Sequence, residues 1–168
     1  AEQVINKYVD AIGGKDNLLK VNDETTVYSG TVQGMNITVT MSKKAPNKFY
    51  QLVDFGVGQQ KVIFDGEKGK SIAMGQEAEL KGDQLESMKV QSQMHPYFNY
   101  EKLGVKLALT GMETINNKDA YQVTVTNPSG KKSTQYYDVA SGFLVRTSAT
   151  VDTEQGSIST TVDFDDYK

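Results

Sequence analysis

Few residues of this chain have side chains that could catalyse a reaction. Its 168 residues include one histidine, His95, and no cysteine. A zinc site with two or more imidazoles, a thiol nucleophile and a histidine-dependent acid–base relay therefore all lack components. Two acidic groups remain that could bind a hard cation or supply paired carboxylates for glycoside hydrolysis. They are Glu77 with Glu79, and Asp163 with Asp165 and Asp166.

We interpret both acidic groups as solvated strand edges, because no companion ligands follow them at the spacing of a calcium loop. His95 precedes Pro96, which disfavours helix at residue 95, so we interpret this histidine as a turn or packing residue. The sequence therefore predicts no catalytic residue, no metal site, no cofactor and no enzymatic activity.

A group of methionine and aromatic residues is more informative, because adaptable apolar side chains suit an apolar guest. Two interpretations stay open for this group: a permanent plug in the core, or a lid over a ligand. Phe49, Val53 and Phe55, from a strand expected at 48–55, would line the same apolar groove. The group itself consists of Leu85, Met88, Met94, Tyr97, Phe98 and Tyr100.

Alternating apolar and polar residues dominate the elements that must position these side chains. Tyr121, Val123 and Val125 alternate with polar residues, and the same period of two returns at 37–41 and 143–149. A period of two predicts strands with one dry face, and hence a wide antiparallel sheet with an apolar side. Something must cover that side.

Helices are few by comparison. Apolar spacing predicts an amphipathic helix at 2–12, and a helix is expected at 83–92 with Asp83 as its N-cap. Turn signals at Gln33-Gly34, Asp65-Gly66 and Ser141-Gly142 separate the predicted strands. Those strands are 25–32, 35–43, 48–55, 61–64, 71–74, 105–112, 120–127 and 132–139, with two more before the end of the chain.

Composition excludes several function classes. Hydrophobic residues make up 38% and charged residues 23% of the chain, and no apolar run approaches the roughly 20 residues of a membrane span. The net charge is -3, and only one of the 18 basic residues is arginine, so nucleic acid is an unexpected partner. The chain begins at Ala1, which we interpret as the start of a processed form or of a fragment.

The ordered set of strand and turn segments resembles the bacterial outer-membrane lipoprotein-sorting (LolA-like) family. The segments that carry the resemblance are 61–66 (KVIFDG), 136–146 (YYDVASGFLVR) and 163–168 (DFDDYK). The resemblance implies an unclosed antiparallel half-barrel whose concave apolar face is covered by helices, and carriage of lipoprotein acyl chains across the periplasm. The ligand-gating arginine of that family has no match here, because Arg146 lies in a later strand, on its polar side.

Residues 8–15 and 41–48 are also similar to the domain that follows zinc-peptidase modules of the insulinase and pitrilysin type. This second resemblance implies a non-catalytic accessory or substrate-presenting domain, because the chain has no paired-histidine zinc motif. A peptidase module in the same polypeptide would then be a partner.

Together these features predict one α+β domain over residues 1–168, a curved antiparallel half-barrel of about ten strands with helices packed on its concave face. The expected function is binding or carriage of an apolar or acylated ligand, either a lipid or a lipoprotein acyl chain, in the periplasm or elsewhere in the bacterial envelope. The peptidase-associated role is the alternative.

Overall fold

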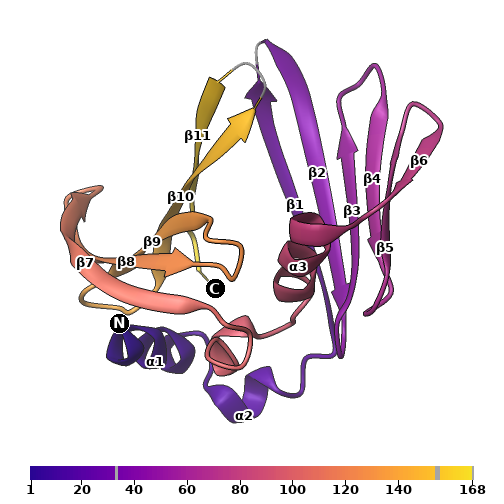
Figure 1. Cartoon of the computed structure of the whole chain (residues 1–168). Helices are drawn as coiled ribbons and strands as arrows, with labels where there is room; N and C mark the ends of the chain where they lie inside the picture. The colour runs from indigo at the N-terminus through magenta and orange to yellow at the C-terminus, as the bar shows by residue number, and fades with distance from the viewer. Residues whose placement is uncertain (33, 154–155, 168) are drawn as a thin grey trace. The chain divides into compact units, whose positions relative to one another are not determined.

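The computed structural model describes residues 1–32, 34–153 and 156–167, and within these it contains eleven strands and three α-helices (Figure 1). The strands form two antiparallel sheets, which confirms the α+β class. Contacts divide the chain into two compact units, Leu19–Phe98 and Ala1–Leu18 with Asn99–Lys168. Gln33 of one predicted turn and Lys168 of the last resemblance segment lie outside the described residues. None of the described helices is long and apolar enough to cross a membrane.

The unit Leu19–Phe98 contains a six-stranded meander in the order β1-β2-β3-β4-β5-β6. Each strand pairs antiparallel with the next one in sequence, as short hairpin connections require. The α3 helix and a 3₁₀ turn follow the sheet. The elements are β1 (Asp23–Val32), β2 (Met35–Lys44), β3 (Lys48–Asp54), β4 (Gln59–Phe64), β5 (Gly69–Ala73), β6 (Gln76–Glu79), α3 (Gly82–Gln91) and η1 (Pro96–Phe98).

Carboxylates fix two of the turns in this meander. Asp54 Oδ1 accepts a hydrogen bond from the Gly56 N–H at 2.7 Å, and Asp65 Oδ1 accepts bonds from the N–H groups of Glu67 and Lys68. These backbone donors lower the pKa of both carboxyls below the ordinary aspartate value. Gly66 has a φ of 114°, a conformation that favours glycine. The turn predicted at Asp65-Gly66 is thus present.

Three sequence-based expectations need correction. The strands number eleven and form two sheets of six and five strands, instead of about ten in one sheet, and no ladder joins the two sheets within the described ranges. The unpredicted strand is β6, whose four residues are all exposed and show no apolar alternation. The N-cap of α3 is Lys81, and Asp83 lies in the first turn, where its charge complements the helix dipole.

The other unit contains a five-stranded sheet in the order β11-β10-β9-β8-β7 and two N-terminal helices. Val123 is fully buried, and Ile115, Ala120 and Tyr136 form a buried cluster against which Val145 packs. These apolar side chains supply the core that the period-two pattern predicts. The elements are α1 (Glu2–Ala11), α2 (Lys15–Leu18), β7 (Lys106–Ile115), β8 (Lys118–Thr126), β9 (Lys132–Asp138), β10 (Leu144–Thr153) and β11 (Gly156–Asp163).

The turn between β9 and β10 packs against α1. Lys7 Nζ donates to the carbonyl oxygens of Val139 at 2.6 Å and Ala140 at 3.0 Å. Inside the turn, Asp138 Oδ1 accepts from both the N–H and the Oγ–H of Ser141 at 2.6 Å. Burial alone would raise the pKa of Asp138, but the hydrogen bonds from Ser141 outweigh it, so this pKa lies below its ordinary value. The turn is therefore held from both sides.

We expect Gly142→Ala to destabilise the protein more than Gly130→Ala. Both glycines have a φ of +82°, so either substitution carries the left-handed backbone cost of about 1–2 kcal/mol. A Cβ at Gly142 would also lie 2.9 Å from Lys7 Cγ and 3.1 Å from the Lys7 carbonyl oxygen, whereas nothing lies within 4 Å at Gly130. This crowding adds about 1.5 kcal/mol. Urea unfolding of the two variants measures the difference. Equal decreases in the free energy of unfolding would show that residue 142 is not in close contact with Lys7 of α1.

Candidate ligand-binding site

Three of the residues expected to bind a ligand meet beneath α3. Phe49, from β3, and Met88, from α3, belong to one buried cluster, and Leu85 of α3 packs against it. Phe49 is 4% and Met88 8% exposed. The cluster contains Phe49, Phe64, Leu80 and Met88, with Met41, Val62 and Leu85 packed on it, and we call it the α3 cluster.

The sheet face that α3 covers continues beyond this cluster. Tyr28 pairs directly with Val39, and Val39 with Val53, so the three side chains form one cross-strand row on the same face as Met41 and Phe49. All three are half-buried. Ile37 and Phe55, also half-buried, lie next to this row along β2 and just beyond β3. We call these residues the apolar strip: Tyr28, Ile37, Val39, Val53 and Phe55.

The apolar strip lies outside the α3 cluster, which ends at Met41 and Val62 within the described residues. In Figure 1, β1 and β2 extend past α3 toward their hairpin tip. Burial, and to a smaller extent the charge of Glu24, raises the pKa of Tyr28 above its ordinary value, so this phenol stays neutral at physiological pH. The strip thus presents an uncharged, largely apolar surface.

The aromatic connector after α3 forms its own cluster. The rings of Tyr97 and Phe98 meet edge to face at 4.8 Å, and His95 lies 5.7–5.8 Å from both. His95 Nδ1 and the Tyr97 hydroxyl are 3.0 Å apart, while His95 Nε2 is buried without a hydrogen-bond partner among the described residues. Met94, just before this cluster, is 8% exposed. His95 is thus a packing residue of the connector.

Tyr100 belongs to the other unit, Ala1–Leu18 with Asn99–Lys168. It forms a side-chain hydrogen bond with Gln135, which also accepts a 2.7 Å bond from the Tyr137 hydroxyl. Burial raises the pKa of Tyr100 despite the opposing effect of Gln135. The Tyr137 ring packs on Tyr8 of α1, with ring centroids 5.3 Å apart. Tyr100 therefore takes part in a tyrosine–glutamine network of its own unit.

A second candidate site lies where β1 and β3 begin and β2 and β4 end. It is a depression of about 560 Å³, a volume typical of small-molecule sites, which span about 300–1,000 Å³. Tyr50 and Ile63 are paired across β3 and β4 and lie on the face opposite Phe49 and Phe64. Phe49 and Phe64 of the α3 cluster also line it, and the remaining lining is Asp23, Glu24, Thr25, Ser42, Lys43, Lys44, Lys48 and Asp65.

Three of the acidic residues considered above, Glu77, Glu79 and Asp163, are paired with basic side chains. Glu77 pairs with Lys70 at 2.9 Å and Glu79 with Lys81 at 3.1 Å. Asp163 forms a two-point hydrogen bond with Arg146 across β10 and β11, which lowers the Asp163 pKa. Among the described residues, no group of three or more His, Asp or Glu side chains could hold a metal ion.

Comparison with known proteins places this geometry in a known fold. No family model and no curated protein matches the sequence. A LolA superfamily protein from Nitrosomonas europaea matches 99% of this chain and 78% of its own, with a TM-score of 0.51 at 12% identity. The chain has a LolA-like fold.

Two further solved structures are similar over most of their lengths. An outer membrane lipoprotein-sorting protein domain from Vibrio parahaemolyticus matches 98% of this chain and 90% of its own, at 8% identity and a TM-score of 0.49. The Mycobacterium tuberculosis lipoprotein LppX matches 96% of this chain and 92% of its own, at 18% identity and a TM-score of 0.38.

Sequence reasoning missed several members of the α3 cluster and the apolar strip. Val62 and Phe64 continue the period of two on β4, and that signal would have placed both on the face of Phe49. Tyr28 and Val39 become neighbours only through the β1–β2 register. Leu80 precedes α3 and follows a strand that the pattern did not reveal. The apolar face of the β1–β6 sheet in this chain is therefore longer than the nine predicted ligand-binding residues indicate.

Proposed function

We propose that this LolA-like chain binds an apolar or acylated ligand, either a lipid or a lipoprotein acyl chain, along the apolar strip beside α3. The observation that carries the proposal is the mismatch between α3 and the sheet face beneath it. The buried cluster under the helix ends at Met41 and Val62, whereas Tyr28, Val39 and Val53 continue the apolar face. An acyl chain that lies along the row of Tyr28, Val39 and Val53 would cover the part of the apolar sheet face that α3 leaves open.

The energetics favour a flexible, weakly specific site. Burial of an acyl chain gains about 0.8 kcal/mol per methylene, so contact with apolar side chains suffices without designed polar contacts. The strip offers two β-branched valines, an isoleucine and two aromatic rings. Such a surface holds chains of different length and places no demand on the head group.

This proposal includes three structural predictions: a half-barrel, a concave groove within it, and a single domain. Met94, Tyr97 and Phe98 would act there either as a lid or as a plug. The role is non-catalytic. The sequence resemblance and the LolA-like fold support a location in the bacterial cell envelope, in the periplasm. Attachment to a zinc peptidase stays a prediction.

Native mass spectrometry of the purified chain tests the proposal. We expect a species heavier by one acyl ligand, lost on extraction with organic solvent and restored by added palmitate. The extracted and reloaded samples should have the same circular dichroism spectrum, which controls for unfolding. A chain that stays ligand-free in the presence of palmitate would contradict a carrier function and favour the accessory role.

A further inference from the structure

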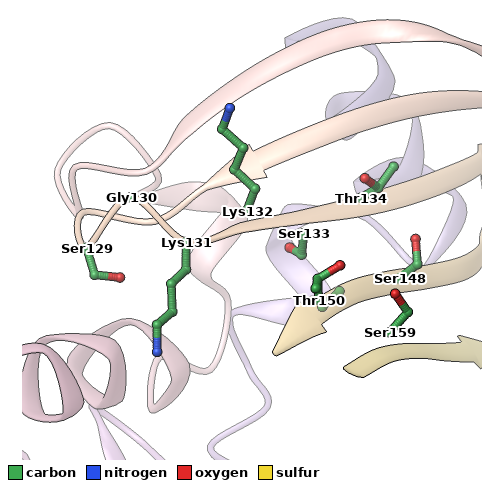
Figure 2. A pocket seen from close by; sticks show the side chains of 10 residues that line it. Ser129, Gly130, Lys131, Lys132, Ser133, Thr134, Ser148, Thr150 and Ser159 are labelled. Carbon is green, nitrogen blue, oxygen red and sulfur yellow. The ribbon is translucent and has the colours of Figure 1, made fainter. Parts of the chain in front are cut away.

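A second cavity, lined mainly by hydroxyl-bearing and lysine side chains, lies in the unit Ala1–Leu18 with Asn99–Lys168. It measures about 680 Å³ and lies between the β8–β9 turn and strands β9, β10 and β11. Figure 2 shows Ser129 and Lys131 on the turn side of the cavity and Ser148, Thr150 and Ser159 on the strand side. Its lining residues are Ser129, Gly130, Lys131, Lys132, Ser133, Thr134, Ser148, Ala149, Thr150 and Ser159.

Cross-strand register gathers the hydroxyl groups of this cavity. Thr134 pairs with Ser148, and Thr150 with Ser159, so each pair projects from one sheet face as direct neighbours. These four hydroxyls make no hydrogen bond to another group within the described part of the chain. Each hydroxyl can donate one hydrogen bond and accept others. The strand side of the cavity therefore suits a ligand that itself carries hydroxyl groups.

Ser129, on the turn side of the cavity, has a hydroxyl group whose hydrogen bonds are not satisfied by the residues that the structure describes. Its Oγ is buried and has no hydrogen-bond partner among residues 1–32, 34–153 and 156–167. A buried polar atom without a partner is destabilising, and native structures rarely keep one without a reason. Because Ser129 lines the cavity, rotation about its Cα–Cβ bond would bring the hydroxyl to a polar group of a bound ligand.

The charged residues that line the cavity indicate the sign of the charge that its ligand would carry. Lys131 and Lys132 line it and form no ion pair within the described ranges, where the lining also contains no carboxylate. Figure 2 shows the two lysines extending to opposite sides of the chain, so their charges are not directed at each other. Because the two lysines extend to opposite sides of the chain, a single ammonium group without an acidic partner among the described residues would face an anion in the cavity.

We propose that this cavity binds a phosphorylated polyol, the chemistry shared by free glycerol phosphate and by the head group of phosphatidylglycerol. A lysine contacts the phosphate as a point charge, and the paired hydroxyls bind the polyol. Inorganic phosphate would leave the hydroxyls unused, and an uncharged polyol would leave the lysines unused. The cavity and the apolar strip belong to different segments of the sequence and to different structural units. The proposal for the cavity therefore does not depend on the proposed acyl-binding function.

Isothermal titration with glycerol 3-phosphate, inorganic phosphate and glycerol tests the proposal. Glycerol 3-phosphate should bind more tightly than either part alone, and the double variant Lys131→Gln/Lys132→Gln should weaken its binding by about tenfold or more. Lys102→Gln, at an exposed lysine outside the cavity lining, is the matched control and should bind as the wild type does. Equal affinity of the double variant and the control would overturn the anion site.

Ser129→Ala separates binding from folding. Without ligand this variant should unfold at the same temperature as the wild type or higher, because it removes an unpaired buried hydroxyl. Its affinity for glycerol 3-phosphate should fall about threefold or more. Unchanged affinity would show that Ser129 does not face the ligand.

Flotation with vesicles identifies the source of the ligand. Binding to vesicles of phosphatidylcholine and phosphatidylglycerol, but not to phosphatidylcholine alone, and loss of that binding in the double lysine variant would assign the head group. Binding of soluble glycerol 3-phosphate without binding to vesicles would identify the ligand as a free phosphorylated polyol. Binding of neither would refute the proposal.

Discussion

Replacement of Phe64 by alanine is expected to lower the free energy of unfolding by about 4 kcal/mol, the typical cost of removing a large buried aromatic side chain. Phe64 is 2% exposed and joins β4 to the α3 cluster, where Phe49, Leu80 and Met88 surround it. The alanine would leave a cavity between sheet and helix. Urea unfolding followed by far-ultraviolet circular dichroism measures this loss.

Val57→Ala is the matched control, because Val57 belongs to the same unit but is 90% exposed. Its effect should stay within about 0.5 kcal/mol. A loss of less than about 1 kcal/mol for Phe64→Ala would mean that α3 does not pack on the sheet as the structure has it.

Val53→Trp is expected to weaken palmitate binding by about a hundredfold. An indole in the middle of the apolar strip would displace three or four methylenes of a bound acyl chain, and each contributes about 0.8 kcal/mol, so the total loss is about 3 kcal/mol. Val53 is half-buried and paired with Val39, so the larger ring can extend over the row without disturbing the α3 cluster. Calorimetric titration with palmitate measures the change.

Leu52→Trp controls for the added ring itself. Leu52 is also half-buried on β3, but its side chain projects to the other face of the sheet, where it is paired with Thr40 and Lys61. This variant should bind palmitate with wild-type affinity. Equal weakening by both variants would exclude the apolar strip as the specific binding surface.

Much of the fold could be predicted from local patterns. Asp65-Gly66 and Ser141-Gly142 are turn sequences with a defined physical cause, and both turns are present. The N-terminal helix was expected at 2–12 and spans Glu2–Ala11. The bounds of β6 could not be predicted, because a strand that is exposed on both faces has no apolar alternation, although the interpretation of Glu77 and Glu79 as a solvated strand edge agrees with its place in the fold.

The candidate sites depend on contacts that periodicity does not specify. Phe49 and Met88 could be nominated because each is apolar on its own element, and they do meet. Tyr100 was predicted from its proximity in sequence to the connector, which gives no sign of its hydrogen bond with Gln135 on β9. The polar cavity was not predicted at all, since Thr134 and Ser148 become neighbours only through the β9–β10 register. Serine and threonine in alternate positions otherwise read as ordinary solvated strand faces.

The most direct test of acyl binding beside α3 uses tryptophan fluorescence, because the chain contains no tryptophan. Tyr28→Trp places a reporter on the apolar strip, and Tyr50→Trp places one on the opposite face of the same sheet. On titration with palmitate, the emission of Tyr28→Trp should shift to shorter wavelength and saturate, while that of Tyr50→Trp stays unchanged. A shift for Tyr50→Trp alone, or for neither variant, would contradict binding along the apolar strip.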